Sequence, residues 1–219
     1  MATERIAAII GDFYHRAEPM LDALNVTAGS LGLSVDPVPD PLRLDWAGLG
    51  SYRGLVIARE NRVAPNENPA RLWATEEHEA ALAAFVKSGG ALAVLHAGLA
   101  SYRIAGPWFE TVRGGFLFHP SEHPSFRVTM LETTHPALAG CSEVELKDEM
   151  YFVRVDSSRT TRLLEVVSPD YGVSCAGWAH AIGKGRVFCL TPGHTNEVLA
   201  NPGYRKLLAQ GMRWVLGMA

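Results

Sequence analysis

Short, mainly apolar runs recur through the first half of the chain, each bounded by glycine, proline or charged residues. They lie at residues 5–11, 33–38, 54–58 and 91–96. The first is a continuous apolar run, which is typical of a strand buried on both faces of a parallel sheet. We predict four strands from these runs, and Pro37, Pro39 and Pro41 are expected to end the second.

Segments with helical spacing of apolar residues lie between the strands. Residues 16–32 form the first, and Thr75 can cap a second that ends at Gly89-Gly90. The last helix is expected to begin after Asn201, with Pro202 at its first position. Strands that alternate with helices indicate a doubly wound sheet with right-handed crossovers.

The pattern changes after residue 115, where shorter strands are predicted. They are expected at residues 126–131, 142–155 and 162–167, followed by a hairpin of residues 174–181 and 185–191. Residues 59–71 read as a long polar loop. The predicted fold class is α/β: a flavodoxin-like, doubly wound, mostly parallel sheet with helices on both faces and an added antiparallel hairpin. A single domain is expected over residues 1–219.

Composition excludes several kinds of partner. With 20 basic and 23 acidic residues the net charge is −3, which argues against nucleic acid and anionic membranes as partners. The sequence predicts neither a signal peptide nor a membrane-spanning segment, so a cytoplasmic location is expected. The three cysteines form no C-x-x-C pair, and Cys175 and Cys189 lie in apolar runs, where buried thiols are expected.

Polar residues follow the carboxyl ends of the predicted parallel strands, where open α/β sheets bind their ligands. Asp12 and His15 follow the first strand, Glu60 the third, His96 the fourth and His194 the last. We therefore expect all five side chains to open onto one rim of the sheet.

His96 is the strongest single candidate. It follows a strand directly, and the small residues Ala97 and Gly98 permit a tight strand-to-helix elbow. An imidazole there can shuttle protons near neutral pH or bind a metal ion. The alternative is a histidine that caps the adjacent helix through hydrogen bonds.

His194, His119 and Glu149 are further catalytic candidates. Pro192-Gly193 aims His194 across the rim, and Pro120 holds His119 extended. Glu149 could act as a general acid or base or orient a histidine, and strand alternation would send Asp148 to the opposite face. The alternatives are a solvated loop histidine for His194, a carbonyl-bound histidine for His119 and an ion pair for Glu149.

Several other signals are weaker or absent. Four histidines on ordinary elements are expected to be structural: His78, His123, His135 and His180. Neither G-x-G-x-x-G after the first strand nor H-E-x-x-H occurs, which argues against dinucleotide and simple zincin sites. A divalent metal such as zinc would need ligands from separate loops, for example His15, His96 and His194, and sequence spacing leaves this open.

An ordered set of motifs extends over nearly the whole chain. It comprises the first strand with His15, Gly89-Gly90-x4-Leu95-His96, Gly114-Gly115-Phe116-x2-His119-Pro120, His135-Pro136-x3-Gly140, Asp148-Glu149-Met150-Tyr151, Trp178 with Gly183-Lys184-Gly185-Arg186-Val187, Pro192-Gly193-His194 and Gly211-x2-Trp214. The set resembles the ThuA-like (trehalose utilisation) family. That resemblance implies a fold similar to class I glutamine amidotransferases. It also implies a role in carbohydrate catabolism, linked to trehalose, related disaccharides and their 3-keto derivatives.

One departure from the amidotransferases limits what the resemblance implies. Their elbow cysteine is replaced here by His96, and no cysteine of this chain falls at a strand-to-helix elbow. Cysteine-dependent glutaminase activity is therefore not expected.

The leading hypothesis is a carbohydrate-processing enzyme that acts on a disaccharide, glycoside or 3-keto derivative by acid–base or metal-assisted chemistry. Its expected catalytic residues are His96, His194, Glu149 and His119. Its expected substrate-binding residues are Asp12, His15, Glu60, Tyr102, Trp108 and Tyr151. The expected partner is a small carbohydrate, and the sequence is compatible with a homo-oligomer. The alternatives are a non-catalytic sugar or metabolite-binding protein and a metal-dependent amide or ester hydrolase.

Overall fold

A parallel half of the central sheet carries the first predicted strands. The computed structural model describes residues 4–218 and contains a nine-stranded sheet of order β2-β1-β3-β6-β13-β12-β11-β8-β9. Its parallel strands are β2 (Ser34–Val38), β1 (Arg5–Ile10), β3 (Gly54–Ala58), β6 (Ala91–Leu95) and β13 (Gly185–Leu190). The side chains of β1, β3 and β6 are nearly all buried, as expected for strands covered on both faces.

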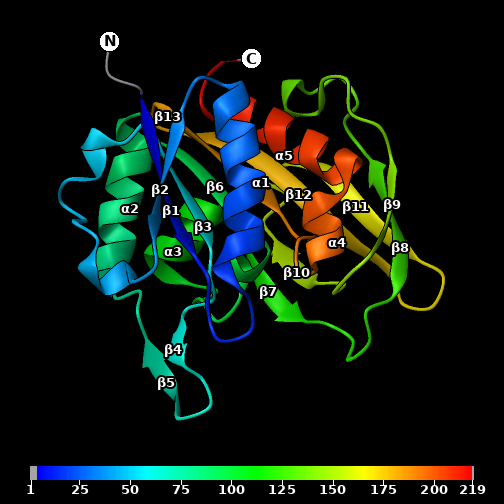
Figure 1. Cartoon of the computed structure of the whole chain (residues 1–219), viewed down its shortest axis with the longest axis horizontal. Coiled ribbons are helices and arrows are strands. Elements are labelled where there is room, and N and C mark those ends of the chain that lie inside the picture. Colours follow the sequence, from blue (N-terminus) through cyan, green and yellow to red (C-terminus); the bar gives the residue numbers. More distant parts are fainter. Residues whose placement is uncertain (1–3, 219) are drawn as a thin grey trace.

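An antiparallel half continues the sheet on the other side of β13. It contains β12 (Gly172–Ile182), β11 (Thr161–Ser168), β8 (Ser125–Met130) and β9 (Val144–Lys147). β12 and β13 form the predicted hairpin. The antiparallel region therefore extends well beyond that hairpin, with β9 at its edge (Figure 1).

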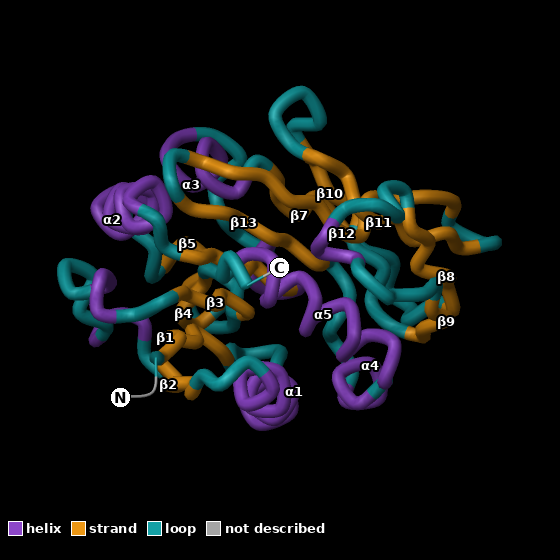
Figure 2. The backbone as a smooth tube through the Cα atoms, turned by 90° about the horizontal axis from the view of Figure 1, so that it is seen from above, coloured by secondary structure: helices purple, strands orange, loops and turns teal. Residues whose placement is uncertain are grey.

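Helices cover both faces of the sheet (Figure 2). One face is covered by α1 (Ala17–Ser30), α4 (Asn196–Ala200) and α5 (Pro202–Val215), and the other by α2 (Glu76–Ser88) and α3 (Gly106–Val112). The expected caps are present, because Thr75 accepts a hydrogen bond from the backbone of α2 and Asn201 does so for α5. The 3-10 helices are η1 (Pro41–Arg43), η2 (Leu49–Ser51), η3 (His96–Leu99) and η4 (Pro136–Leu138).

Two segments differ from the sequence predictions. The expected loop at 59–71 contains a hairpin of β4 (Arg62–Ala64) and β5 (Asn68–Leu72), which projects from the body of the molecule (Figure 1). The single strand expected at 142–155 is two strands, because β9 ends at Lys147 and β10 (Phe152–Val155) joins β7 (Gly114–Phe118) in a separate sheet. Glu149 therefore lies in irregular chain, where strand alternation does not apply.

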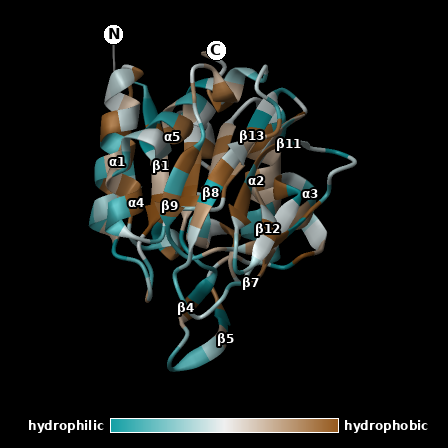
Figure 3. Cartoon of the chain, turned by 90° about the vertical axis from the view of Figure 1, so that its right-hand side faces the viewer, coloured by the Kyte–Doolittle hydropathy of each residue, from teal (hydrophilic) through white to brown (hydrophobic). Residues whose placement is uncertain are grey.

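Apolar side chains fill the space on each side of the sheet. Figure 3 shows hydrophobic residues along the central strands and more hydrophilic residues on the outer helices and the β4–β5 hairpin. Cys175 and Cys189 are buried free thiols, as predicted, and burial raises the pKa of both. Among residues 4–218, no helix is long and apolar enough to cross a membrane.

Candidate functional site

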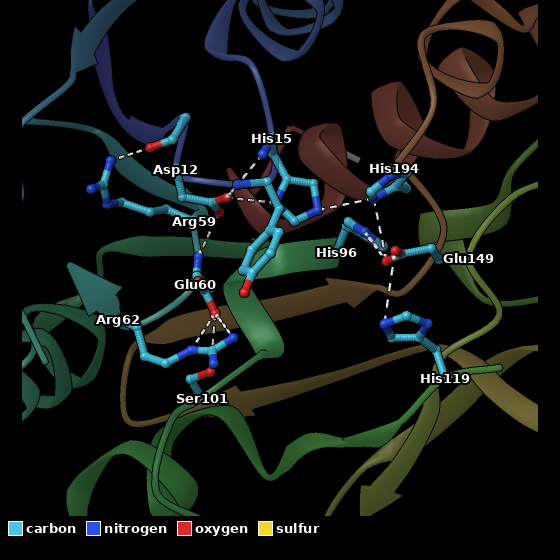
Figure 4. Close-up of polar contacts among 12 residues, drawn as sticks. Asp12, His15, Arg59, Glu60, Arg62, His96, Ser101, His119, Glu149 and His194 are labelled. Carbon is cyan, nitrogen blue, oxygen red and sulfur yellow. Dashed lines mark hydrogen bonds and ion pairs between the residues drawn. The ribbon is translucent and has the colours of Figure 1, made fainter. Parts of the chain in front are cut away.

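Four of the predicted site residues converge at the carboxyl edge of the parallel strands (Figure 4). His15 lies between β1 and α1, His96 follows β6, His194 lies between β13 and α4, and Glu149 comes from the segment between β9 and β10. Each offers one ligand atom, and these atoms all lie within 4.8 Å of one another. The two halves of the sheet thus supply one cluster.

His15 is oriented by Asp12, whose side chain is fully buried. Asp12 Oδ1 accepts a hydrogen bond from His15 Nδ1 at 2.7 Å and also from the backbone N–H groups of Tyr14 and His15. Burial alone would raise the pKa of Asp12, but the bond and charge of His15 outweigh it and the pKa lies below its ordinary value. Neutral His15 therefore carries its lone pair on Nε2, which faces the cluster.

His96 is held in a strained backbone at the start of η3, with a φ of 40°. Its Nδ1 lies 2.8 Å from the carbonyl oxygen of Thr191, and its ring stacks on Tyr151 with centroids 4.3 Å apart. Gly98 is required nearby, because a Cβ there would lie 2.1 Å from the carbonyl oxygen of Ile57. The elbow therefore aims a buried Nε2 at Glu149, 3.4 Å from its Oε2.

His194 is positioned by Asp148, a buried carboxylate. Asp148 accepts hydrogen bonds from the backbone N–H groups of Gly193, His194 and Thr195, at 2.7, 3.1 and 2.9 Å. Gly193 has a φ of 135°, a conformation that favours glycine. This turn places Nδ1 of His194 3.0 Å from His15 Nε2 and 3.3 Å from Glu149 Oε2.

Glu149 is the one acidic member of the cluster. Burial alone would raise its pKa, but hydrogen bonds and charge from His194 and His96 lower it strongly. The same contact with Glu149 raises the pKa of His194, although burial opposes the change. Glu149 is therefore a carboxylate at neutral pH, and it is the natural counter-charge for a cation or for imidazolium.

The arrangement fits a divalent metal ion. Two ligand atoms that each lie about 2.1 Å from a tetrahedral ion are about 3.4 Å apart. The contacts at 3.0, 3.3 and 3.4 Å are close to that spacing. Imidazole nitrogens and a carboxylate oxygen suit zinc and related ions, and metal-bound histidines typically donate their other N–H to a carboxylate or carbonyl, as His15 and His96 can here.

A cavity of about 310 Å³ opens beside the cluster. Glu60 lines it and is 2% exposed, and its Oε2 accepts hydrogen bonds from Arg62 Nε and Nη2 at 2.9 and 2.7 Å and from Ser101 Oγ at 3.1 Å. Glu60 Oε1 is buried and has no hydrogen-bond partner among the described residues. An acceptor in this state favours a ligand that brings a hydroxyl or N–H group.

A family model described as trehalose utilisation (ThuA) matches residues 11–215. The chain belongs to the ThuA family. The family connects it with trehalose utilisation, as the order of sequence motifs predicted. Among curated proteins, no sequence matched this chain.

Solved structures confirm the fold of this ThuA-family protein. A protein described as thua-like from Parabacteroides merdae has a TM-score of 0.78 at 16% identity, over 98% of this chain and 90% of that chain. One from Bacteroides uniformis has a TM-score of 0.71 at 18% identity, over 97% and 90%. A glutamine amidotransferase from Thermotoga maritima has a TM-score of 0.64 at 12% identity, over 99% of both chains. The predicted amidotransferase-like fold is therefore confirmed.

Most of the residues singled out in the ThuA-family sequence lie at the cluster or its cavity. His119 and Tyr151 line the cavity with Glu60, and Asp12 supports His15. Tyr102 and Trp108 lie away from the cluster and its cavity. Their rings stack in the core with centroids 3.8 Å apart, and Tyr102 donates its hydroxyl hydrogen to the carbonyl oxygen of Arg59. The expected sugar contacts of these two residues are wrong, because packing in the core buries both side chains.

Three of the four histidines set aside as structural have local partners. His78 and His135 cap α2 and η4. His180 is buried with Nε2 2.9 Å from the carbonyl oxygen of Thr111, and burial lowers its pKa to about 4. His123 was misjudged as an isolated residue, because its Nε2 lies 3.8 Å from Glu149 Oε1.

Sequence reasoning also missed Asp148, Arg62 and Ser101. Asp148 was assigned to the face opposite Glu149, yet it organises the loop of His194. The spacing of His119-Pro120 and His123-Pro124 was an available signal for His123, since the two histidines repeat the same dipeptide four residues apart. No comparable signal marked Arg62 or Ser101.

Proposed function

We propose that this ThuA-family protein is a carbohydrate-processing enzyme that acts on a disaccharide, glycoside or 3-keto derivative with the help of one divalent cation. The cation would be held by His15, His96, His194 and Glu149. The observation that carries the proposal is the convergence of four ligand atoms within 4.8 Å. The orienting partners of His15 and His96 give the same support, because such partners direct a chosen nitrogen at a metal.

A bound divalent cation would supply Lewis-acid stabilisation of negative charge on a sugar oxygen. The chain's own residues prepare the site for it. Asp12 and the carbonyl oxygen of Thr191 hold two imidazoles in position, and Asp148 holds the loop of the third. Tyr151 covers His96 and excludes water from that side of the cluster.

The cavity supports a polyhydroxyl ligand. Glu60 lines it, and one carboxylate oxygen of Glu60 has no hydrogen-bond partner among the described residues, so a small shift of this buried side chain would let it accept a hydrogen bond from a sugar hydroxyl. Arg62 and Ser101 keep this carboxylate in place. The volume of about 310 Å³ lies at the small end of ligand pockets, which favours a ligand of about one sugar ring inside the cavity.

A substrate panel tests the proposal. Disaccharides, glycosides and 3-ketoglycosides are incubated with chelator-treated protein, alone and after addition of Zn²⁺, Co²⁺ or Mn²⁺, and products are identified by mass spectrometry. We expect product after cation addition, and a loss of at least about 10²-fold in His96→Ala. His135→Asn is the matched control, because it lies outside the cluster and asparagine can keep the cap on η4.

Other results would contradict the proposal in distinct ways. Thermal stabilisation by a sugar without any product would favour a sugar-binding protein. Turnover confined to amides or esters would favour a hydrolase of another class. Full sugar turnover by chelated protein would remove the cation from the mechanism.

A further inference from the structure

We infer that His119, His123 and the second carboxylate oxygen of Glu149 form another cation site, so that Glu149 bridges two divalent ions. The inference rests on the proposed first site and extends it. Glu149 Oε2 faces His96 and His194, whereas Oε1 lies 3.8 Å from His119 Nε2 and 3.8 Å from His123 Nε2. Each oxygen of the carboxylate therefore has its own pair of imidazoles.

The two contacts of Oε1 are too long for hydrogen bonds. They are suitable for ligands of a shared ion, because atoms about 2.1 Å from a metal reach this spacing at an angle of about 130°. His119 Nδ1 lies 2.6 Å from the carbonyl oxygen of Pro120, an arrangement that leaves the lone pair of the neutral ring on Nε2. Within residues 4–218, neither Nε2 makes a hydrogen bond to another residue.

The backbone holds these two histidines beside Glu149. Both belong to the loop between β7 and β8, and each precedes a proline, which restricts the histidine to extended conformations. The carbonyl oxygen of Pro124 accepts a hydrogen bond from the backbone N–H of Asp148 at 3.3 Å. That bond ties the histidine loop to the segment that carries Glu149.

The charge around the cluster favours bound cations. Three buried or half-buried carboxylates lie there, those of Asp12, Asp148 and Glu149. Among the described residues, no lysine or arginine forms an ion pair with any of them. Buried negative charges are costly unless opposite charge offsets them, so these carboxylates favour the binding of divalent cations at the cluster.

The second site is the more open of the two. The side chains of His119 and His123 are 35% and 37% exposed, against 1% for His96. Two imidazoles and one carboxylate oxygen leave room for oxygen atoms of a ligand. A pair of ions would bind two neighbouring oxygens of one sugar, such as a ketone and the adjacent hydroxyl. The site therefore favours substrates with vicinal oxygens.

Ion counting on the full chain tests the inference. Chelated protein is dialysed against Co²⁺ and the bound ions are counted, for the native chain, for His119→Ala/His123→Ala and for the control His135→Asn. We expect two ions per chain in the native and control proteins and one in the double variant, with the affinity of the remaining ion changed less than about tenfold. With Mn²⁺, the native protein should give an exchange-coupled electron paramagnetic resonance signal that the double variant lacks.

The outcomes separate this inference from the proposed function. One ion in the native chain would overturn the second site and leave the first in place. No bound ion would overturn both. Two ions in the double variant would place the second ion elsewhere and also contradict the inference. Circular dichroism of each variant verifies that an altered count does not come from unfolding.

Discussion

The two halves of the sheet contribute to the site in different ways. The parallel half delivers His15, His96 and His194 directly from strand ends, through a short turn or a strained elbow. The antiparallel half delivers Glu149, His119 and His123 from irregular segments between strands. The first three histidine side chains are 15%, 1% and 20% exposed, whereas His119 and His123 are 35% and 37% exposed.

This difference indicates that the two halves have different tasks. Strand ends are rigid, and they hold three imidazole nitrogens at the spacing that one ion needs. Segments on the antiparallel side bring the one carboxylate of the cluster, Glu149, and the two more exposed imidazoles of His119 and His123. Glu149 is the residue at which the two sides meet. Substitutions in the two halves should therefore differ in the property they change and in the size of the change.

Glu149→Gln should have the largest effect on cation binding, because it removes the charge that the two proposed ion sites would share. We expect cation binding to weaken by at least about 10²-fold and sugar turnover to be lost with it. Equilibrium dialysis with Co²⁺ measures the change. Glu145→Gln, which alters an exposed carboxylate paired with Arg127 in the same half, is the control. Unchanged Co²⁺ binding in Glu149→Gln would show that Glu149 does not bind an ion.

Asp12→Asn should have an intermediate effect confined to the parallel side. The amide can no longer accept a charge-assisted bond from His15 Nδ1, so the ring loses its fixed orientation. We expect a 10- to 100-fold weaker affinity for the first ion, the usual range for such partners. Asp36→Asn, at an exposed pair with Arg5, is the control. An equal loss of cation affinity in Asp12→Asn and Asp36→Asn would contradict the orienting role of Asp12.

His180 and the cluster should respond to acid in different ways. His180 is buried in β12 of the antiparallel half, and burial lowers its pKa to about 4. Between about pH 6.5 and about 4 the unfolded chain binds a proton at His180 that the folded chain excludes. The free energy of unfolding therefore decreases as the pH is lowered, by at most about 1.4 kcal/mol per pH unit. Denaturant melts over this range should show a shallower slope in His180→Gln. An identical slope would mean that His180 is protonated in the fold.

Titration of His194 should have the smallest effect on the free energy of unfolding, and its sign should be opposite to that of His180. Glu149 raises its pKa, so in cation-free protein the contact stabilises the fold below the ordinary histidine range. That stability is lost as the pH rises through the raised pKa. Melts of chelated protein should show a shallow decline above about pH 6.5 that is absent in Glu149→Gln. A decline that persists in this variant would assign it to another group.

The parallel half could be predicted from the sequence in detail, and the antiparallel half could not. Apolar runs located β1, β3 and β6 closely, and the rule that ligands bind at strand ends then selected His15, His96 and His194. Residues 142–155 were read as one strand because apolar residues flank the acids. The break at Lys147 depends on long-range pairing with β8 and β7, which local pattern does not encode.

The same limit explains the errors at single residues. His123 joins the cluster because its loop folds back onto the Glu149 segment, a tertiary contact made through Pro124 and Asp148. Tyr102 and Trp108 have the composition of a sugar-binding surface, but the fold buries them against each other. Packing between elements that are distant in the sequence decides whether an aromatic side chain is buried. Aromatic residues occur both in protein cores and at ligand sites, so their presence in the sequence does not distinguish the two.

Anomalous diffraction from crystals grown with Zn²⁺ would show whether His15, His96, His194 and Glu149 hold one ion. We expect a zinc peak about 2.0 to 2.2 Å from His15 Nε2, His96 Nε2, His194 Nδ1 and Glu149 Oε2. A crystal in which zinc binds elsewhere, or in which these four atoms keep their contacts around no ion, would contradict this expectation.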